Sequence, residues 1–72
     1  MNISLYDFRN LPSQTQSEIV IEQGRLLNEK VMSSFKYVLY EISSFSVEVI
    51  YKNTDGKIVG LNIFQNTSAY AT

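Results

Sequence analysis

The feature that most constrains the fold is Asp55-Gly56, a turn signal between two segments rich in β-branched and aromatic residues. The string Asn53-Thr54-Asp55-Gly56 favours a type I turn closed by a glycine in the left-handed region, which makes a G1-bulge hairpin. This turn predicts a strand over 45–51, a returning strand over 57–64, and Tyr51 opposite Val59. The sequence therefore predicts an antiparallel hairpin.

A second turn tests the register of this hairpin. Ser43-Ser44 separates the strand pattern 35–42 from 45–51, and Ser33-Ser34 is a similar turn, so the strands form a meander over 25–64. Because residues that lie opposite each other share a face, both turns must agree on the buried side of the sheet. They do agree, and the predicted buried face consists of Val38, Tyr40, Ile42, Phe45, Val47, Val49, Tyr51, Val59, Leu61 and Ile63.

A helix is expected before the meander, over 13–23. Ser13 and Gln16 have the spacing of a capping box, and Gly24 is placed to end the helix in the left-handed region. The β-branched run Ile19-Val20-Ile21 has low helix propensity and is also compatible with a strand. Because the signals at both ends agree, we predict a helix.

These elements predict the α+β class, with one N-terminal helix packed on a three- to four-stranded antiparallel β-meander. The 72 residues (8.2 kDa) suffice for a single domain with one small core, in which roughly 62% of the unfolded surface is buried. We expect one domain over 1–72, with an N-terminal segment (1–11), the helix (13–23), the meander (25–64) and a tail (65–72).

The other side of the predicted sheet is too apolar to be fully solvated. Its large apolar residues are Phe35, Tyr37, Leu39, Ile50, Ile58 and Phe64, diluted by polar residues such as Glu41, Glu48 and Lys52. One short helix covers only one side of a sheet. Therefore either the N-terminal segment with Ile3, Leu5, Tyr6 and Phe8 covers this second face, or another molecule does. As interface residues we predict Phe35, Tyr37, Leu39, Ile50 and Phe64.

Composition excludes many chemistries. The chain has no Cys and no His, which removes thiol chemistry, zinc fingers and histidine catalysis. Glu41 and Glu48 share the second face, but we interpret them as solubilising residues rather than an acid–base pair. We therefore expect no catalytic residues, no cofactor, no metal and no enzymatic activity.

Charge and hydropathy bear on partners and location. The formal net charge is −1, without the basic excess that nucleic-acid binding requires. No apolar run is long enough to span a membrane, and the first residues lack the pattern of a secretion signal, so we expect a cytoplasmic location.

The sequence thus favours a small non-enzymatic protein-binding module that forms a homodimer or higher oligomer or binds one host protein. Small proteins of this composition are often carried by phages or mobile elements, where inhibition of a host system by direct binding is typical. The alternative is an oligomer that binds or sequesters a small phosphorylated, nucleotide-like ligand. Tyr37 and Phe35 would stack on it, with Lys30 and Lys52 beside them.

The stretch Leu39-Tyr40-Glu41-Ile42-Ser43-Ser44-Phe45-Ser46-Val47-Glu48-Val49-Ile50-Tyr51, with Gly24 upstream and 58–64 downstream, resembles a group of short uncharacterised bacterial and mobile-element proteins. Their pattern is a helix that ends in glycine, a leucine–tyrosine strand and a phenylalanine-x-valine-glutamate-valine strand. The resemblance covers about Leu11 to Phe64 and implies a helix followed by a meander. The ending Asn66-Thr67-Ser68-Ala69-Tyr70-Ala71-Thr72 differs from the leucine-proline-tyrosine ending of the group.

Overall fold

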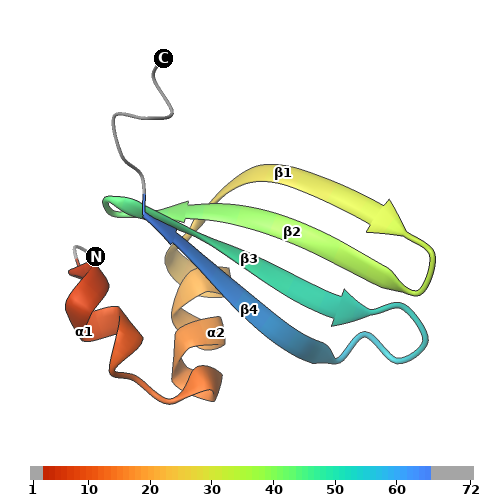
Figure 1. Cartoon of the computed structure of the whole chain (residues 1–72), viewed down its shortest axis with the longest axis horizontal. Helices are drawn as coiled ribbons and strands as arrows, with labels where there is room; N and C mark the ends of the chain where they lie inside the picture. The colour runs from red at the N-terminus through yellow and green to blue at the C-terminus, as the bar shows by residue number, and fades with distance from the viewer. Residues whose placement is uncertain (1–2, 66–72) are drawn as a thin grey trace.

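The computed structural model of the protein describes residues 3–65. Two helices, α1 (Leu5–Arg9) and α2 (Ser13–Gln23), precede a four-stranded antiparallel sheet in the order β1-β2-β3-β4 (Figure 1). The strands are β1 (Arg25–Met32), β2 (Phe35–Ile42), β3 (Phe45–Lys52) and β4 (Ile58–Gln65). The predicted α+β class is confirmed. Of the predicted tail, Gln65 belongs to β4, and 66–72 lie outside the described residues.

Helix α1 is an element that the sequence prediction missed. The Ser4 hydroxyl caps it by accepting a hydrogen bond from the Asp7 backbone N–H (3.0 Å). Its Phe8 side chain is fully buried, and the rings of Phe8 and Phe45 lie 5.0 Å apart. The N-terminal segment therefore packs on the same side of the sheet as α2 and does not cover the second face.

Helix α2 has the predicted bounds, but its N-terminal cap is different. Pro12 occupies the N-cap position, and no side chain caps the helix, so the expected capping box of Ser13 and Gln16 does not form. The Gln16 side chain is buried and donates a hydrogen bond to the Phe8 backbone carbonyl (2.8 Å). This bond connects α2 to α1, and it explains why Gln16 is not free to reach back to the cap.

Gly24 ends α2 as predicted, but not in the predicted conformation. Gly24 has φ −75° and ψ 150°, which is extended backbone and not the left-handed conformation. A Cβ atom at this position would lie 2.5 Å from the Val20 carbonyl oxygen and 3.0 Å from the Tyr40 Cβ. Glycine is required here because a Cβ would collide with the Val20 carbonyl in the last turn of α2 and would also press on Tyr40 of β2.

The strand registers follow the two serine turns as predicted. Ile42 lies opposite Phe45, and Met32 lies opposite Phe35, so each turn consists of two serines. The first serine of each turn has positive φ, 48° for Ser33 and 55° for Ser43. Serine therefore adopts the left-handed region at both turns, although this conformation is unfavourable for serine.

The β3–β4 turn differs from the prediction by one residue. Gly56 has φ 71°, as expected, but the turn closes on Lys52, which pairs with Lys57 through a backbone hydrogen bond of 2.8 Å. Tyr51 lies opposite Ile58, and a bulge at Val59 restores the predicted pairing of Val49 with Leu61. Tyr51 therefore does not face Val59, which is 52% exposed and not a core residue.

This shift also corrects the position of Ile58. Because Ile58 lies opposite Tyr51, it belongs to the helix-covered face and not to the second face.

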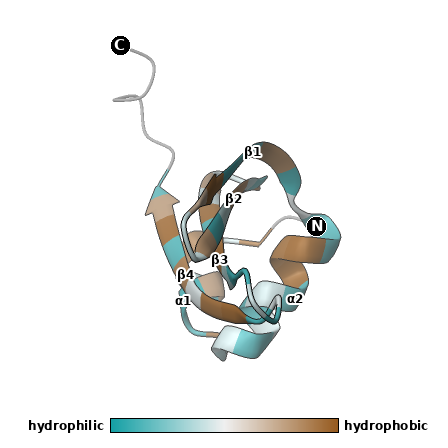
Figure 2. Ribbon diagram, turned by 90° about the vertical axis from the view of Figure 1, so that its right-hand side faces the viewer, coloured by the Kyte–Doolittle hydropathy of each residue, from teal (hydrophilic) through white to brown (hydrophobic). Residues whose placement is uncertain are grey.

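The core lies between the helices and one face of the sheet, which we call the helix-covered face. Both helices lie near the end of the sheet where β1 begins, and the β1–β2 and β3–β4 turns project beyond them (Figure 1). Figure 2, viewed from these turns, shows hydrophobic and hydrophilic stretches along the strands. The buried cluster consists of Phe8, Val20, Ile42, Phe45, Val47 and Val49. Neither helix within 3–65 is long and apolar enough to cross a membrane.

Candidate protein-binding surface

The second face of the sheet, which we call the open face, carries the predicted interface residues side by side. Tyr37 lies opposite Ile50, and Leu39, two residues along β2, shares their side. Phe35 and Phe64 occupy the same face toward opposite ends of the sheet, opposite Lys52 and Ser46. Sequence reasoning therefore grouped these residues correctly.

The apolar side chains of the open face are only partly buried. Phe35 is 37% exposed and Phe64 is 38% exposed, whereas Phe45 on the helix-covered face is 0% exposed. Tyr37, Leu39 and Ile50 at the centre are half-buried by their neighbours in the sheet. Among residues 3–65, the buried core cluster draws on the helices and the other face, so aromatic and aliphatic surface is left at the open face.

The β1 strand adds Met32 to this face, a residue that the sequence prediction did not include, and it also carries the predicted Lys30. Met32 lies opposite Phe35 and is 49% exposed, and Lys30 lies opposite Tyr37. The Ser33-Ser34 turn was the signal for both positions, because a two-residue turn fixes which β1 residues oppose Phe35 and Tyr37.

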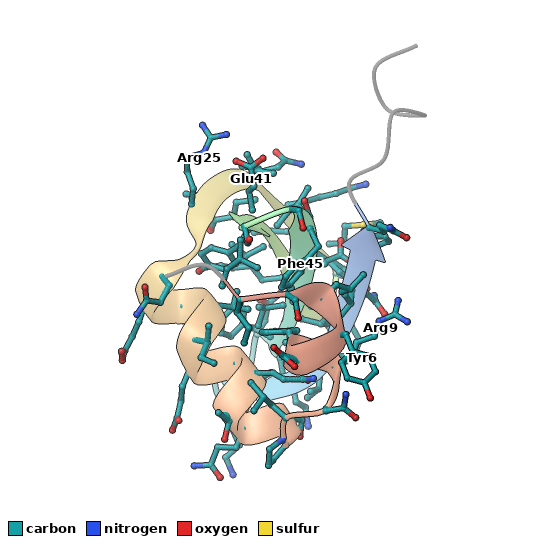
Figure 3. All side chains as sticks on the ribbon, turned by 90° about the vertical axis from the view of Figure 1, so that its left-hand side faces the viewer. Tyr6, Arg9, Arg25, Glu41 and Phe45 are labelled. Atoms are coloured by element: carbon teal, nitrogen blue, oxygen red, sulfur yellow. The ribbon has the colours of Figure 1, made fainter. Side chains whose placement is uncertain are left out.

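Two carboxylates lie on the open face toward the end nearer the helices. Glu41 accepts hydrogen bonds from Arg25, at 2.6 Å from Nη2 and 3.1 Å from Nε (Figure 3). Glu48, on the neighbouring strand, accepts a hydrogen bond of 3.1 Å from the Asn62 side-chain amide. Each carboxylate thus has its own polar partner, and the pair is not arranged as two groups that share a proton.

The opposite end of the open face is basic. Lys52 lies opposite Phe35 next to the β3–β4 turn, and Lys57 faces Lys52 across that turn. Lys30 stands one position further in on β1, opposite Tyr37. The structure therefore brings the two predicted aromatic–lysine pairs together, Tyr37 with Lys30 and Phe35 with Lys52.

A groove on the other side of the molecule was not predicted. It has a volume of about 480 Å³ and lies between the first turns of α2 and the beginning of β4. Its lining comes from Ser13, Gln14, Gln16 and Ser17 on α2 and Ile58, Val59, Gly60 and Leu61 on β4. No lining side chain is ionisable, so the groove offers hydrogen bonds and apolar contact but no acid–base group.

The hydroxyls of Tyr51 and Tyr40 interact on the helix-covered face. The pKa of the Tyr51 hydroxyl is raised to about 12, first by desolvation and then by a hydrogen bond and a charge interaction with Tyr40. Such a phenol stays protonated at neutral pH and has no tendency to act as a base. Within residues 3–65, no three metal-ligating His, Cys, Asp or Glu side chains cluster.

Comparison with known proteins finds no matching family, no matching curated protein and no matching solved structure. The resemblance to short bacterial and mobile-element proteins therefore stays a prediction.

Proposed function

We propose that this chain is a small non-enzymatic protein-binding module and that the open face is its contact surface. The observation that carries the proposal is the distribution of the helices. Both pack on the helix-covered face, and the open face keeps a continuous set of apolar side chains around Tyr37, Leu39 and Ile50.

The composition of the open face supports binding of another protein. Aromatic residues and methionine are enriched in protein interfaces, and charged residues are depleted at the interface centre. Here Tyr37, Leu39 and Ile50 lie at the centre beside one carboxylate, Glu48, which accepts a hydrogen bond from Asn62, while Arg25 and Lys52 stand toward the margins. Large apolar patches on small proteins mark interaction sites, because their exposure to water is unfavourable.

The open face is also suited to contact without catalysis. Its carboxylates are held by Arg25 and Asn62, and the sequence contains neither cysteine nor histidine. The face therefore presents shape, apolar area and charge. Inhibition of a host system by direct binding is one role that such a surface supports, and we retain it as part of the proposal.

A small phosphorylated ligand is the alternative, and one observation favours it. Lys30 stands beside Tyr37, and Lys52 stands beside Phe35, so an aromatic ring and a cation are adjacent twice on the same face. These positions lie on an open sheet surface, whereas ligand sites of this kind are usually concave. The protein-binding function is therefore the one we put forward.

The test replaces the apolar centre of the open face with charge. We expect the purified chain to form a dimer, or to co-purify stoichiometrically with one protein from its natural host, as measured by light scattering and mass. The double variant Leu39→Lys, Ile50→Lys should lose that partner while keeping its helices and sheet by circular dichroism. The matched control is Ile21→Lys, which alters a 47% exposed residue on α2.

Two results would overturn the proposal. One is a wild-type chain that stays monomeric at high concentration and has no protein partner. The other is a double variant that keeps its partner. Tight binding of a nucleotide by the monomeric chain, lost in Lys30→Ala and Lys52→Ala, would support the small-ligand alternative instead.

A further inference from the structure

The charges on the open face are distributed unequally between its two ends. Arg25, Glu41 and Glu48 lie in the half nearer the helices, and their formal charges sum to a negative value. Lys30 and Lys52 lie in the half nearer the turns, together with Lys57.

Asp55 in the β3–β4 turn is the acidic residue at this end, and its carboxylate accepts a hydrogen bond from the Lys57 backbone N–H (3.0 Å). The three lysines outweigh it, so the turn end is positive.

We propose that the partner of the open face is a second copy of this chain, packed face to face with its strands running in the opposite direction. This inference rests on the proposed function and specifies its partner. A two-fold axis between the sheets and perpendicular to the strands places the turn end of one copy over the helix end of the other. The basic half of each open face then covers the acidic half of its partner, and both ends become complementary.

The other simple arrangement is disfavoured by the same charges. A two-fold axis parallel to the strands places like ends together, with Lys52 and Lys57 of one copy near the same lysines of the other. Like charges brought together at an interface are repulsive and select against that orientation. Charge therefore distinguishes the two arrangements, although both would bury the same apolar centre.

The size of the face is sufficient for this pairing. Each strand has 8 residues in a sheet of four strands, which gives a flat area of roughly 26 Å by 19 Å, or about 500 Å² per copy. Two copies together bury about 1,000 Å² or more, which reaches the lower bound for a specific interface. Packing one sheet on another also yields the usual β-sandwich, in which inner faces interdigitate.

The apolar centre fits the same axis. Tyr37 and Ile50 form one cross-strand pair and Leu39 and Glu48 form the next, so the midpoint of the face lies between these pairs. Reversal of the strand direction about this midpoint places Tyr37 of one copy over Leu39 of the other. Gly60, opposite Ile50, has no side chain, and a Cβ there would be 3.5 Å from the Ile50 Cδ1. The Ile50 side chain therefore extends toward Gly60 and adds apolar surface on the β4 side of the centre.

A distance measurement tests the orientation directly. The natural chain has no cysteine, so the variant Thr54→Cys places a single spin label in the β3–β4 turn of the full chain. In the proposed dimer the two labels lie at opposite ends of the sandwich, farther apart than the strand length of roughly 26 Å. Labels closer than about 20 Å in a dimer would overturn the proposed orientation while leaving the proposed function intact.

Charge reversal provides the second measurement, because it should weaken the dimer in one orientation and strengthen it in the other. In the proposed dimer, Lys52→Glu should weaken self-association, with a dimer dissociation constant raised about tenfold. Added salt should also weaken the wild-type dimer. The double variant Lys52→Glu, Glu48→Lys exchanges the signs at both ends and should recover most of the lost affinity.

Tighter association of Lys52→Glu would overturn the inference, because it indicates that like ends meet. The matched control is Lys36→Glu, which changes a lysine of β2 that faces the helix-covered side and pairs with Glu29 at 3.0 Å. It should leave the dimer dissociation constant unchanged. A monomeric chain bound to a different protein would also overturn the inference, but not the proposed function.

Discussion

The two faces of the sheet are built from the same strands by the same alternation of side chains, yet within residues 3–65 only one of them forms a core. Phe45 on the helix-covered face is 0% exposed, and Phe35 on the open face is 37% exposed. Both are the first residue of a strand that follows a two-serine turn. The difference is the second layer, because Phe8 of α1 packs on the ring of Phe45.

This comparison shows that an apolar face of a sheet is only half of a core. Alternation decides which residues share a face, but burial requires another element of the chain or another molecule. In residues 3–65, the elements available for this purpose are α1 and α2, and both contribute to the same cluster through Phe8 and Val20. The open face keeps the pattern of a core surface without the covering layer.

The largest expected effect is the loss of the Phe45 ring. Phe45→Ala should lower the free energy of unfolding by about 3–5 kcal/mol, because it leaves a cavity beneath Phe8. The matched variant Phe35→Ala removes the same atoms from a partly exposed site and should cost less than half as much in the monomer. Urea denaturation at low protein concentration measures both variants. Similar losses for the two would show that the faces do not differ as described.

The division into two faces was predictable because it depends on local signals. The Ser43-Ser44 turn fixes Tyr40 opposite Val47, and the alternating apolar residues then define one side. The pairing of Val49 with Leu61 was also predicted correctly, since a later bulge compensated for the different turn. The alternation of apolar residues in β3 and β4 therefore predicts the correct pairing even though the turn was predicted one residue off.

The features that were missed depend on contacts between distant parts of the chain. Gln16 looked like a capping residue from its spacing to Ser13, but it bonds the Phe8 carbonyl, which only the packing of α1 brings near. Gly24 ends α2 as predicted, but in extended backbone, and it must lack a side chain because a Cβ would meet the Val20 carbonyl oxygen and Tyr40. Helix α1 itself is 5 residues long and shows too few periodic positions to be recognised.

The candidate surface was likewise predicted in part, correctly where strand register decides and wrongly where a bulge intervenes. Tyr37, Leu39 and Ile50 were placed together from strand register alone, and the structure shows them together. Ile58 was assigned to the wrong face because the bulge at Val59 reverses the alternation between Ile58 and Gly60. A bulge adds a single residue, and the sequence between Gly56 and Leu61 contains no specific signal for its position.

The second prediction tests the turn that sets the register of β4, and hence which of its residues occupy each face. Gly56→Val should lower the free energy of unfolding by about 1–2 kcal/mol, because a β-branched residue is strained at φ 71°. A Cβ at Gly56 meets nothing within 4 Å, so the cost is conformational and not steric. Thermal or urea unfolding measures it.

The control for this variant is Gly60→Ala, which adds a methyl group to the open face. Its Cβ would contact the Ile50 Cδ1 at 3.5 Å, an ordinary van der Waals distance. Stability of the monomer should then change by less than about 0.5 kcal/mol. If Gly56→Val unfolds at the wild-type denaturant concentration, the turn does not need the left-handed conformation.

The smallest expected effect concerns alkaline pH and the hydroxyl pair of the helix-covered face. The pKa of Tyr51 is raised to about 12 in the folded chain, first by desolvation and then by Tyr40, whereas an unfolded tyrosine has a pKa of about 10. Between these values the unfolded chain releases a proton that the folded chain retains. The unfolded state therefore binds fewer protons, and the free energy of unfolding falls as the pH rises from about 10 toward about 12.

This contribution to stability is fully present below pH 10. Because Tyr51→Phe has no hydroxyl to ionise, its free energy of unfolding should not show this fall at alkaline pH. The measurement is the change in urea midpoint between pH 8 and pH 11. This change is compared between the wild type and Tyr51→Phe. The wild type should lose more stability than the variant across this interval. Equal losses would mean that Tyr51 is as accessible to hydroxide as an unfolded tyrosine, and that burial on the helix-covered face ends before it reaches the turns.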